Sequence, residues 1–219
     1  MTSEPGPLRL GPSGPAAKAL CVFVHGRGQT PEDMEAHVVA RLGVDDIAFV
    51  LPRAPNGAWY QARAVDPLTP VARAELATAL DHLAAAVTAA RGVYPGLPLL
   101  LAGFSQGACL AIEYVSAGLP APEALAALTG CRVGVAADGR PKAAPRGLPV
   151  YLSGADADPW IPAEAAGDAI GSLGGQGAVV RADLFPGRPH EVSDAEIAML
   201  RGMLQDLAAG RSPRMEAPR

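Results

Sequence analysis

The residues best suited to chemistry in this chain are one serine, one histidine and two neighbouring aspartates, which stand far apart in the sequence. Ser105 is the middle residue of a Gly-x-Ser-x-Gly pattern, residues 103–107 (GFSQG), between a short apolar run and a helix-forming run. In that context the pattern predicts a nucleophile on a tight strand-to-helix turn, with glycines where a Cβ would collide with the crossing backbone. A chance match in a chain with 25 glycines is the alternative, and the flanking strand and helix argue against it.

A serine hydroxyl needs a base to take its proton as it attacks, and the chain offers four histidines. His37 and His82 fall inside expected helices, away from the strand ends, and are expected to be ordinary helix residues. His25 precedes a glycine-rich loop and is interpreted as a residue that holds this loop in place. His190 follows the last expected strand and completes the order serine, acid, histidine known from one class of serine enzymes. We therefore take His190 as the base, with a surface-loop histidine as the alternative.

The acid that orients the base is expected in the loop after the strand at residues 148–153, where Asp156 and Asp158 both lie. Asp158 is preferred because it directly precedes residues 159–162 (PWIP), in which two prolines stiffen the backbone and set the direction of the carboxylate. Asp156 stays open as the alternative acid, as a solvated charge or as a cap of the local turn.

Two backbone amides are candidates for binding the negative oxygen that forms during attack. They belong to Gln106, directly after the serine, and to Arg27, in the loop after an early strand. Only the amide of Arg27 is needed for this purpose. Its side chain can either recruit an anionic part of a substrate or reach into solvent, and we favour solvent.

The rest of the chain alternates short apolar runs with helix-forming segments. Strands are expected at residues 19–24, 47–51, 98–104, 124–128, 148–153 and 178–185, and helices at residues 31–42, 71–91, 108–115, 163–173 and 193–207. Such alternation predicts an α/β fold with a mostly parallel central sheet and helices on both faces. The site should then lie where the carboxyl ends of the strands meet.

The domain organisation follows from where this pattern begins and ends. Residues 1–17 are rich in proline and glycine and are expected to be a flexible segment with at most a weak strand near residues 8–10. Residues 18–209 form one domain, and residues 210–219 are expected to be a flexible tail. No apolar run approaches the length of about 20 residues that a membrane span needs, so we expect no stable membrane insertion.

Composition excludes several functions. With 18 basic and 22 acidic residues and no basic cluster, the chain is not expected to bind nucleic acid. The start of the chain lacks the pattern of an export signal, so a cytoplasmic location is expected. The cysteines stand far apart, without metal or redox spacing, and are expected to be small buried hydrophobic residues: Cys21, Cys109 and Cys131. No metal site is predicted.

Four segments together resemble the phospholipase/carboxylesterase family of α/β-hydrolases: residues 24–28 (VHGRG), 103–108 (GFSQGA), 158–162 (DPWIP) and 187–191 (GRPHE). The resemblance runs from about residue 19 to residue 207. It implies a compact α/β-hydrolase domain without a lid domain, a Ser105, Asp158 and His190 triad, and hydrolysis of esters or thioesters without metal or another cofactor. The acid loop, at residues 154–158, is one residue longer than the usual form, and the loop at residues 59–60 is more similar to bacterial members than to acyl-protein thioesterases.

The expected function is a serine carboxylesterase that cleaves small esters through an acyl-enzyme intermediate. The alternatives are a thioesterase, a lysophospholipase or a lactone hydrolase, and, from another class, an inactive binding protein with the same fold. The partner is a small-molecule ester, and a homodimer is left open. Trp59, Tyr60 and Trp160 lie in loops that could line the site or equally cover local core. If they line it, they form a shallow apolar wall suited to acyl groups of about two to eight carbons.

Overall fold

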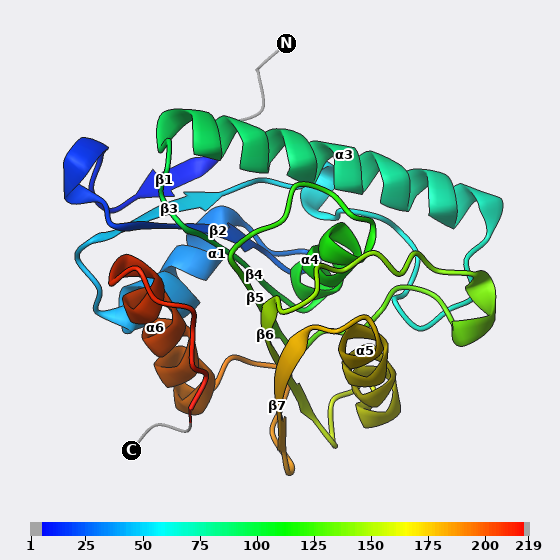
Figure 1. Ribbon diagram of the computed structural model, residues 1–219. Helices are drawn as coiled ribbons and strands as arrows, with labels where there is room; N and C mark the ends of the chain where they lie inside the picture. Colours follow the sequence, from blue (N-terminus) through cyan, green and yellow to red (C-terminus); the bar gives the residue numbers. More distant parts are fainter. Residues whose placement is uncertain (1–5, 217–219) are drawn as a thin grey trace.

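The computed structural model describes residues 6–216 and centres on a seven-stranded sheet in the order β1-β3-β2-β4-β5-β6-β7. The pairing of β1 with β3 is antiparallel, and every other pair is parallel (Figure 1). The strands are β1 Leu8–Leu10, β2 Ala19–Val24, β3 Ile47–Leu51, β4 Leu99–Phe104, β5 Ala124–Leu128, β6 Pro149–Ala155 and β7 Val179–Phe185. The predicted fold class, an α/β fold with a mostly parallel sheet, is confirmed.

Helices cover both faces of the sheet, as Figure 1 shows. The helices are α1 Pro31–Met34, α2 Ala40–Leu42, α3 Pro70–Val93, α4 Gln106–Ser116, α5 Ala163–Gly175 and α6 Asp194–Ala208. Helices α3, α4 and α5 pack on one face, and α1, α2 and α6 pack on the other. No helix within residues 6–216 is long and apolar enough to cross a membrane.

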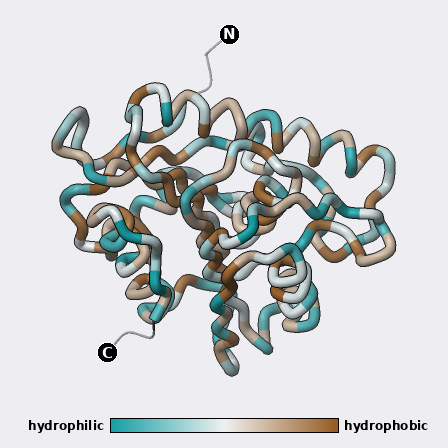
Figure 2. Tube along the Cα trace, viewed as in Figure 1, coloured by the Kyte–Doolittle hydropathy of each residue, from teal (hydrophilic) through white to brown (hydrophobic). Residues whose placement is uncertain are grey.

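The central strands are buried on both faces because helices cover them on both sides. Every residue of β2, β3, β4 and β5 is buried, in agreement with their continuous apolar runs (Figure 2). Alternate residues of one strand therefore enter two different cores. Leu20 and Val22 pack with α3 and α4, while Cys21 and Phe23 pack with α1 and α6.

The first helical segment follows its predicted start but contains an irregular turn. Thr30 caps the helix, its side chain accepts the amide of Asp33, and the Asp33 carboxylate accepts the amide of Thr30 in return. A π-helical turn, Glu35–Val39, separates α1 from α2 and carries His37. The sequence does not indicate this π-helical turn. Met34, Val38 and Leu42 are spaced as in a regular helix, and all three are buried as they would be in one.

The structure corrects the two predicted flexible ends in part. Leu8–Leu10 is an edge strand of the sheet, with Leu8 opposite Leu51, so the folded unit begins before residue 18. At the other end Met215 is buried, and its carbonyl accepts a hydrogen bond from Arg181 at 2.8 Å. Residues 211–216 therefore pack against the domain. Residues 1–5 and 217–219 of the predicted flexible ends lie outside the described part.

Candidate active site

Ser105 stands on a sharp turn between β4 and α4 in a backbone conformation that a residue with a side chain rarely adopts. Its φ is 55° and its ψ is −121°. The neighbouring backbone crosses so closely that a Cβ on Gly107 would lie 2.1 Å from the carbonyl oxygen of Val24, and one on Gly103 would lie 2.5 Å from Gly107. The two glycines of the pattern are therefore steric requirements of the turn, as expected from the sequence.

The loops after three parallel strands bring three side chains together. Ser105 follows β4, Asp158 follows β6 and His190 follows β7. The Ser105 Oγ lies 2.9 Å from His190 Nε2, and the Asp158 carboxylate lies 2.6 Å from His190 Nδ1. Both distances are those of hydrogen bonds. The arrangement can therefore pass a proton from the hydroxyl to a ring whose other nitrogen is held by a carboxylate.

The carboxylate of Asp158 is held in place by its own loop. One oxygen accepts the amides of Trp160 and Ile161, each at 2.8 Å, and the other faces His190. Burial acts to raise the pKa of Asp158, but the hydrogen bonds from His190 and these two amides outweigh it and hold the pKa below its ordinary value. The carboxylate is consequently ionised at pH 7.

The second aspartate of this loop has a different contact. Asp156 accepts the amide of Gly187 at 2.6 Å and so ties the acid loop to the turn that leads to His190. Of the two aspartates, the structure places Asp158 rather than Asp156 against the histidine ring.

Two amides that could bind a negative oxygen flank Ser105. In the described part of the chain, neither the amide of Arg27 nor that of Gln106 donates to a protein acceptor. The Gln106 side chain packs away from this place: its oxygen accepts the amide of Trp59 at 3.0 Å, and its nitrogen donates to the carbonyl of Tyr60 at 2.7 Å. Gln106 therefore also fixes the loop beside the serine, a role that its place in the sequence does not reveal.

His25 packs beside the loop that carries Arg27 and hydrogen-bonds to it. Its Nε2 accepts the amide of Ala54 at 3.0 Å, which leaves the proton on Nδ1, 2.8 Å from the carbonyl of Gly26. Burial lowers the pKa of His25, so the ring is neutral at pH 7 as this bonding requires. The ring holds the loop in place, as interpreted from the sequence. Gln29 assists by accepting the amide of Gly26 at 3.1 Å.

Comparison of the sequence with models of protein families shows which family this chain belongs to. The family model for phospholipase/carboxylesterase matches residues 11–207, which is most of the sequence. The chain belongs to the phospholipase/carboxylesterase family. No curated protein matches the sequence.

Solved structures agree with this membership. A phospholipase/carboxylesterase from Dyadobacter fermentans DSM 18053 is 29% identical, with a TM-score of 0.77 and coverage of 94% of this chain and 99% of that chain. Esterase PE8 is 26% identical, with a TM-score of 0.74 and coverage of 92% and 98%. Acyl-protein thioesterase 2 from Zea mays, at 17% identity and a TM-score of 0.72 over 92% and 98%, shares the fold. The family match and the first two of these structures support a serine hydrolase of the carboxylesterase type.

A cavity of about 400 Å³ opens beside Ser105 and His190 in this phospholipase/carboxylesterase family member. Its wall includes Tyr60 and the exposed ring of Trp160, so two of the three predicted aromatic residues face it. The other lining residues are Arg27, Gln61, Ala62, Arg63, Ala64, Gln106, Cys109 and Ile161.

Of the two alternatives for Trp59, the structure favours the one in which it covers local core. Its ring is buried, 5.2 Å from the ring of His25 and 5.6 Å from that of His82, and it does not line the cavity. Its Nε1 donates to the carbonyl of His25 at 2.9 Å. Trp59 therefore supports the glycine-rich loop from behind, because its polar atom finds a partner there while the ring fills local core.

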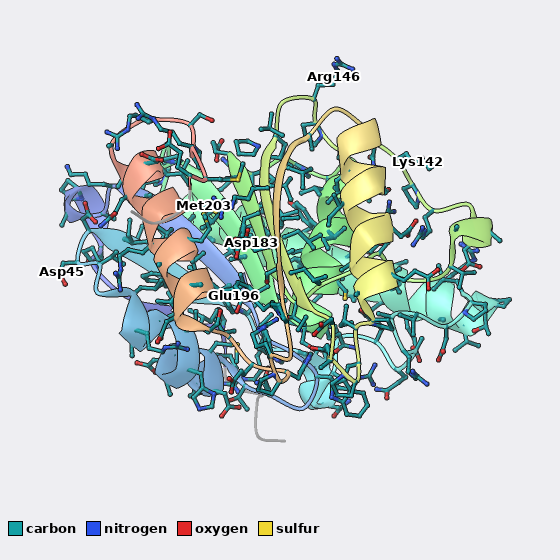
Figure 3. All side chains as sticks on the ribbon, turned by 90° about the horizontal axis from the view of Figure 1, so that it is seen from below. Asp45, Lys142, Arg146, Asp183, Glu196 and Met203 are labelled. Carbon is teal, nitrogen blue, oxygen red and sulfur yellow. The ribbon has the colours of Figure 1, made fainter. Side chains whose placement is uncertain are left out.

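A buried ion pair beneath the histidine loop was not predicted from the sequence. Arg188 lies two residues before His190 and contacts Glu196 of α6 at 2.9 Å, Thr129 at 2.7 Å and the carbonyl of Glu191. Figure 3 shows Glu196 at the start of α6. The Glu196 carboxylate also accepts the hydroxyl of Ser153 from β6. Glu196 also forms a capping box with Ser193 at the start of α6, and nothing in that local pattern indicates the buried ion pair with Arg188.

Replacing Arg188 with methionine should weaken both the fold and catalysis. The change leaves Glu196 as an uncompensated buried carboxylate and should lower the free energy of unfolding by about 3 kcal/mol. It also releases the loop of His190, and a displacement of the ring by about 1 Å should lower kcat by up to about 10²-fold. Denaturant unfolding and steady-state kinetics measure the two effects.

The control is Arg211→Met. This change breaks the ion pair between Arg211 and Asp206, in which the arginine side chain is 52% exposed, and it should leave kcat unchanged. Wild-type kcat in folded Arg188→Met would contradict the anchoring role.

Proposed function

We propose that this family member is a carboxylesterase that cleaves small carboxylic esters through a Ser105-His190-Asp158 triad. The observation that carries the proposal is the continuous line of hydrogen bonds from the Ser105 hydroxyl through both ring nitrogens of His190 to the Asp158 carboxylate. An exposed loop histidine without a catalytic role would have no reason to contact the serine of the strained turn and a carboxylate together.

Each residue has a defined part in the proposed reaction. His190 Nε2 takes the hydroxyl proton as Ser105 Oγ attacks the ester carbonyl, and the amides of Arg27 and Gln106 donate to the oxygen that becomes negative. The protonated ring then gives its proton to the departing alcohol, which leaves an acyl group on Ser105. Water attacks this acyl group and loses a proton to His190, and the ring returns a proton to Ser105 Oγ as the acyl–oxygen bond breaks, which releases the acid and the free serine. Asp158 holds the ring and stabilises its charged form throughout.

The cavity supports a small substrate. Its volume of about 400 Å³ is near the lower end of the range for small-molecule pockets, and its wall mixes apolar groups such as Ile161 with polar ones. Each methylene group that the wall buries adds at most about 0.8 kcal/mol to binding of the acyl chain. We therefore propose a preference for acyl groups of about two to eight carbons.

A panel of p-nitrophenyl esters with acyl chains from acetate to palmitate tests this proposal. The ratio kcat/KM should rise over the short chains, reach its maximum within eight carbons and fall beyond it. A thioester and a lactone of matched size, measured alongside, determine the preferred leaving group. Activity that keeps rising through palmitate would contradict the proposed size limit.

Labelling with a fluorophosphonate separates an esterase from an inactive binding protein. The reagent should modify the wild-type protein once, at Ser105, because only an activated serine reacts. Ser105→Ala, identical in all other respects, is the control and should not be labelled. Absence of both labelling and ester hydrolysis would overturn the proposed function and favour a binding protein with a hydrolase fold.

A further inference from the structure

The charged side chains that line the cavity beside Ser105 are all positive. Arg27 and Arg63 both line it, and none of its lining residues is an aspartate or a glutamate. Among the described residues, neither arginine has a carboxylate within ion-pair distance, although the chain as a whole has a net charge of −4. Within residues 6–216, nine of the fifteen arginines have a carboxylate partner, and of the six without one Arg27 and Arg63 are the two that line this cavity.

The two arginines lie at the same part of the wall. The guanidinium of Arg27 donates to the carbonyl of Ala62 at 2.7 Å, and Arg63 is the next residue. This hydrogen bond holds the guanidinium at the cavity wall, where Arg27 is exposed, so the side chain can both reach solvent and meet an anionic group of a substrate. Four of the five guanidinium N–H groups of Arg27 stay available for an acceptor.

A buried hydroxyl on the same wall also has no partner. Tyr60 is only 3% exposed, and within residues 6–216 its hydroxyl makes no hydrogen bond. A buried donor without an acceptor costs free energy, but this hydroxyl atom is itself fully buried and does not open onto the cavity. Burial raises the pKa of Tyr60 well above its ordinary value, which keeps the hydroxyl protonated and able to donate at neutral pH.

The carboxylates closest to this wall are already engaged. Glu113 is buried and forms a two-point ion pair with Arg132, at 2.7 and 3.1 Å. Glu75 of α3 accepts the amide of Gln61 at 2.9 Å, and Asp158 faces His190. No carboxylate within residues 6–216 pairs with Arg27 or Arg63, so both guanidinium groups keep donors for an anion from outside the chain.

We propose that this wall binds a second, negatively charged group of the substrate, a carboxylate or a phosphate, a few bonds from the ester carbonyl. Guanidinium groups recognise both anions through charge-assisted hydrogen bonds. The inference rests on the proposed esterase activity and specifies its substrate class as anionic esters. Arg63 is then a residue that determines specificity.

Pairs of esters of equal size measure the preference. On the acyl side, mono-p-nitrophenyl glutarate is compared with p-nitrophenyl hexanoate, and on the alcohol side 4-carboxyphenyl acetate is compared with 4-methoxycarbonylphenyl acetate. Phenyl acetate bearing a 4-phosphate, against its dimethyl ester, tests the phosphate as the source of the charge. The anionic member of at least one pair should have the higher kcat/KM, by about five- to tenfold, and the preference should fall as salt is added.

Substitution of Arg63 assigns the preference to this wall. Arg63→Gln should bring the ratio of kcat/KM for the anionic and neutral esters close to one, and Arg63→Glu should reverse it. Arg146→Gln is the matched control and should leave the ratio unchanged. Arg146 is also exposed, but it precedes β6 and so lies at the end of the sheet opposite the site loops (Figure 3).

The outcomes of the two proposals are distinct. If wild-type protein cleaves none of the esters, the proposed esterase function fails. If it cleaves the anionic and neutral members of every pair equally well, and the Arg63 variants do the same, the esterase function stands and the anion subsite is overturned.

Discussion

Replacing Ser105 with alanine should lower kcat for p-nitrophenyl butyrate by a factor on the order of 10⁶, because the residual protein has no nucleophile to form the acyl-enzyme. The fold should be unaffected. The Ser105 hydroxyl contacts only the His190 ring among the described side chains, and alanine keeps the Cβ that the strained turn already accommodates. Thermal unfolding should therefore show a melting temperature within a few degrees of the wild type.

A second serine provides the control for this result. Ser13 is exposed and its side chain makes no capping hydrogen bond, so Ser13→Ala should match the wild type in both kcat and melting temperature. Adding His190→Ala to Ser105→Ala should cause little further loss, because nucleophile and base act as a unit. Near wild-type turnover by folded Ser105→Ala would disprove the proposed mechanism, and a double variant much slower than either single one would contradict the coupling.

Replacing Asp158 with asparagine should lower kcat by about 10³- to 10⁴-fold. An amide at this place can turn its NH₂ group toward His190 Nδ1, which moves the ring proton to Nε2, where it blocks proton transfer from Ser105. The side-chain oxygen of asparagine can still accept the amides of Trp160 and Ile161, so the acid loop should keep its shape.

The other aspartate of the loop is the matched control for this change. Asp156→Asn keeps an oxygen for the amide of Gly187 and removes only a charge that does not contact the histidine. It should lower kcat by less than about tenfold, as expected for a change outside the triad. Steady-state kinetics on both variants at one pH decides between them, and the reverse ranking would assign the acid to Asp156.

The sequence was sufficient for most of the fold because the strands of this sheet are buried on both faces. The segment at residues 99–104, for example, is a continuous apolar run that ends at the glycine-rich turn, and the structure makes it β4. The short edge strand β1 has only three residues and one strand beside it, so its local sequence carried a weak signal. Residues 211–216 pack through Met215 onto Arg181, a contact between distant segments that no local pattern indicates.

The sequence likewise pointed to some residues of the candidate site and not to others. The structure brings Ser105, Asp158 and His190 together, and the sequence pointed to them through the Gly-x-Ser-x-Gly pattern and through loops that follow strands, with Asp156 left open as the acid. The sequence could not show which side of its loop each tryptophan faces, and the structure turns Trp59 into the core and leaves Trp160 61% exposed at the cavity. Arg188 and Glu196 also escaped prediction, since a charged residue in a loop or at a helix start is usually solvated.

Helix α6, which covers the core formed with α1 and α2, is the last of the described helices to be synthesised. Its residues Ile197, Leu200 and Leu204 cover Cys21 and Phe23 of β2, which is synthesised early. A nascent chain therefore carries an apolar sheet face without its cover until α6 emerges, and such faces are prone to association. Because Glu196 of the same helix anchors the loop of His190 through Arg188, docking of α6 also completes the site. Recovery of hydrolysis during refolding would then report the closing step of folding rather than formation of the sheet.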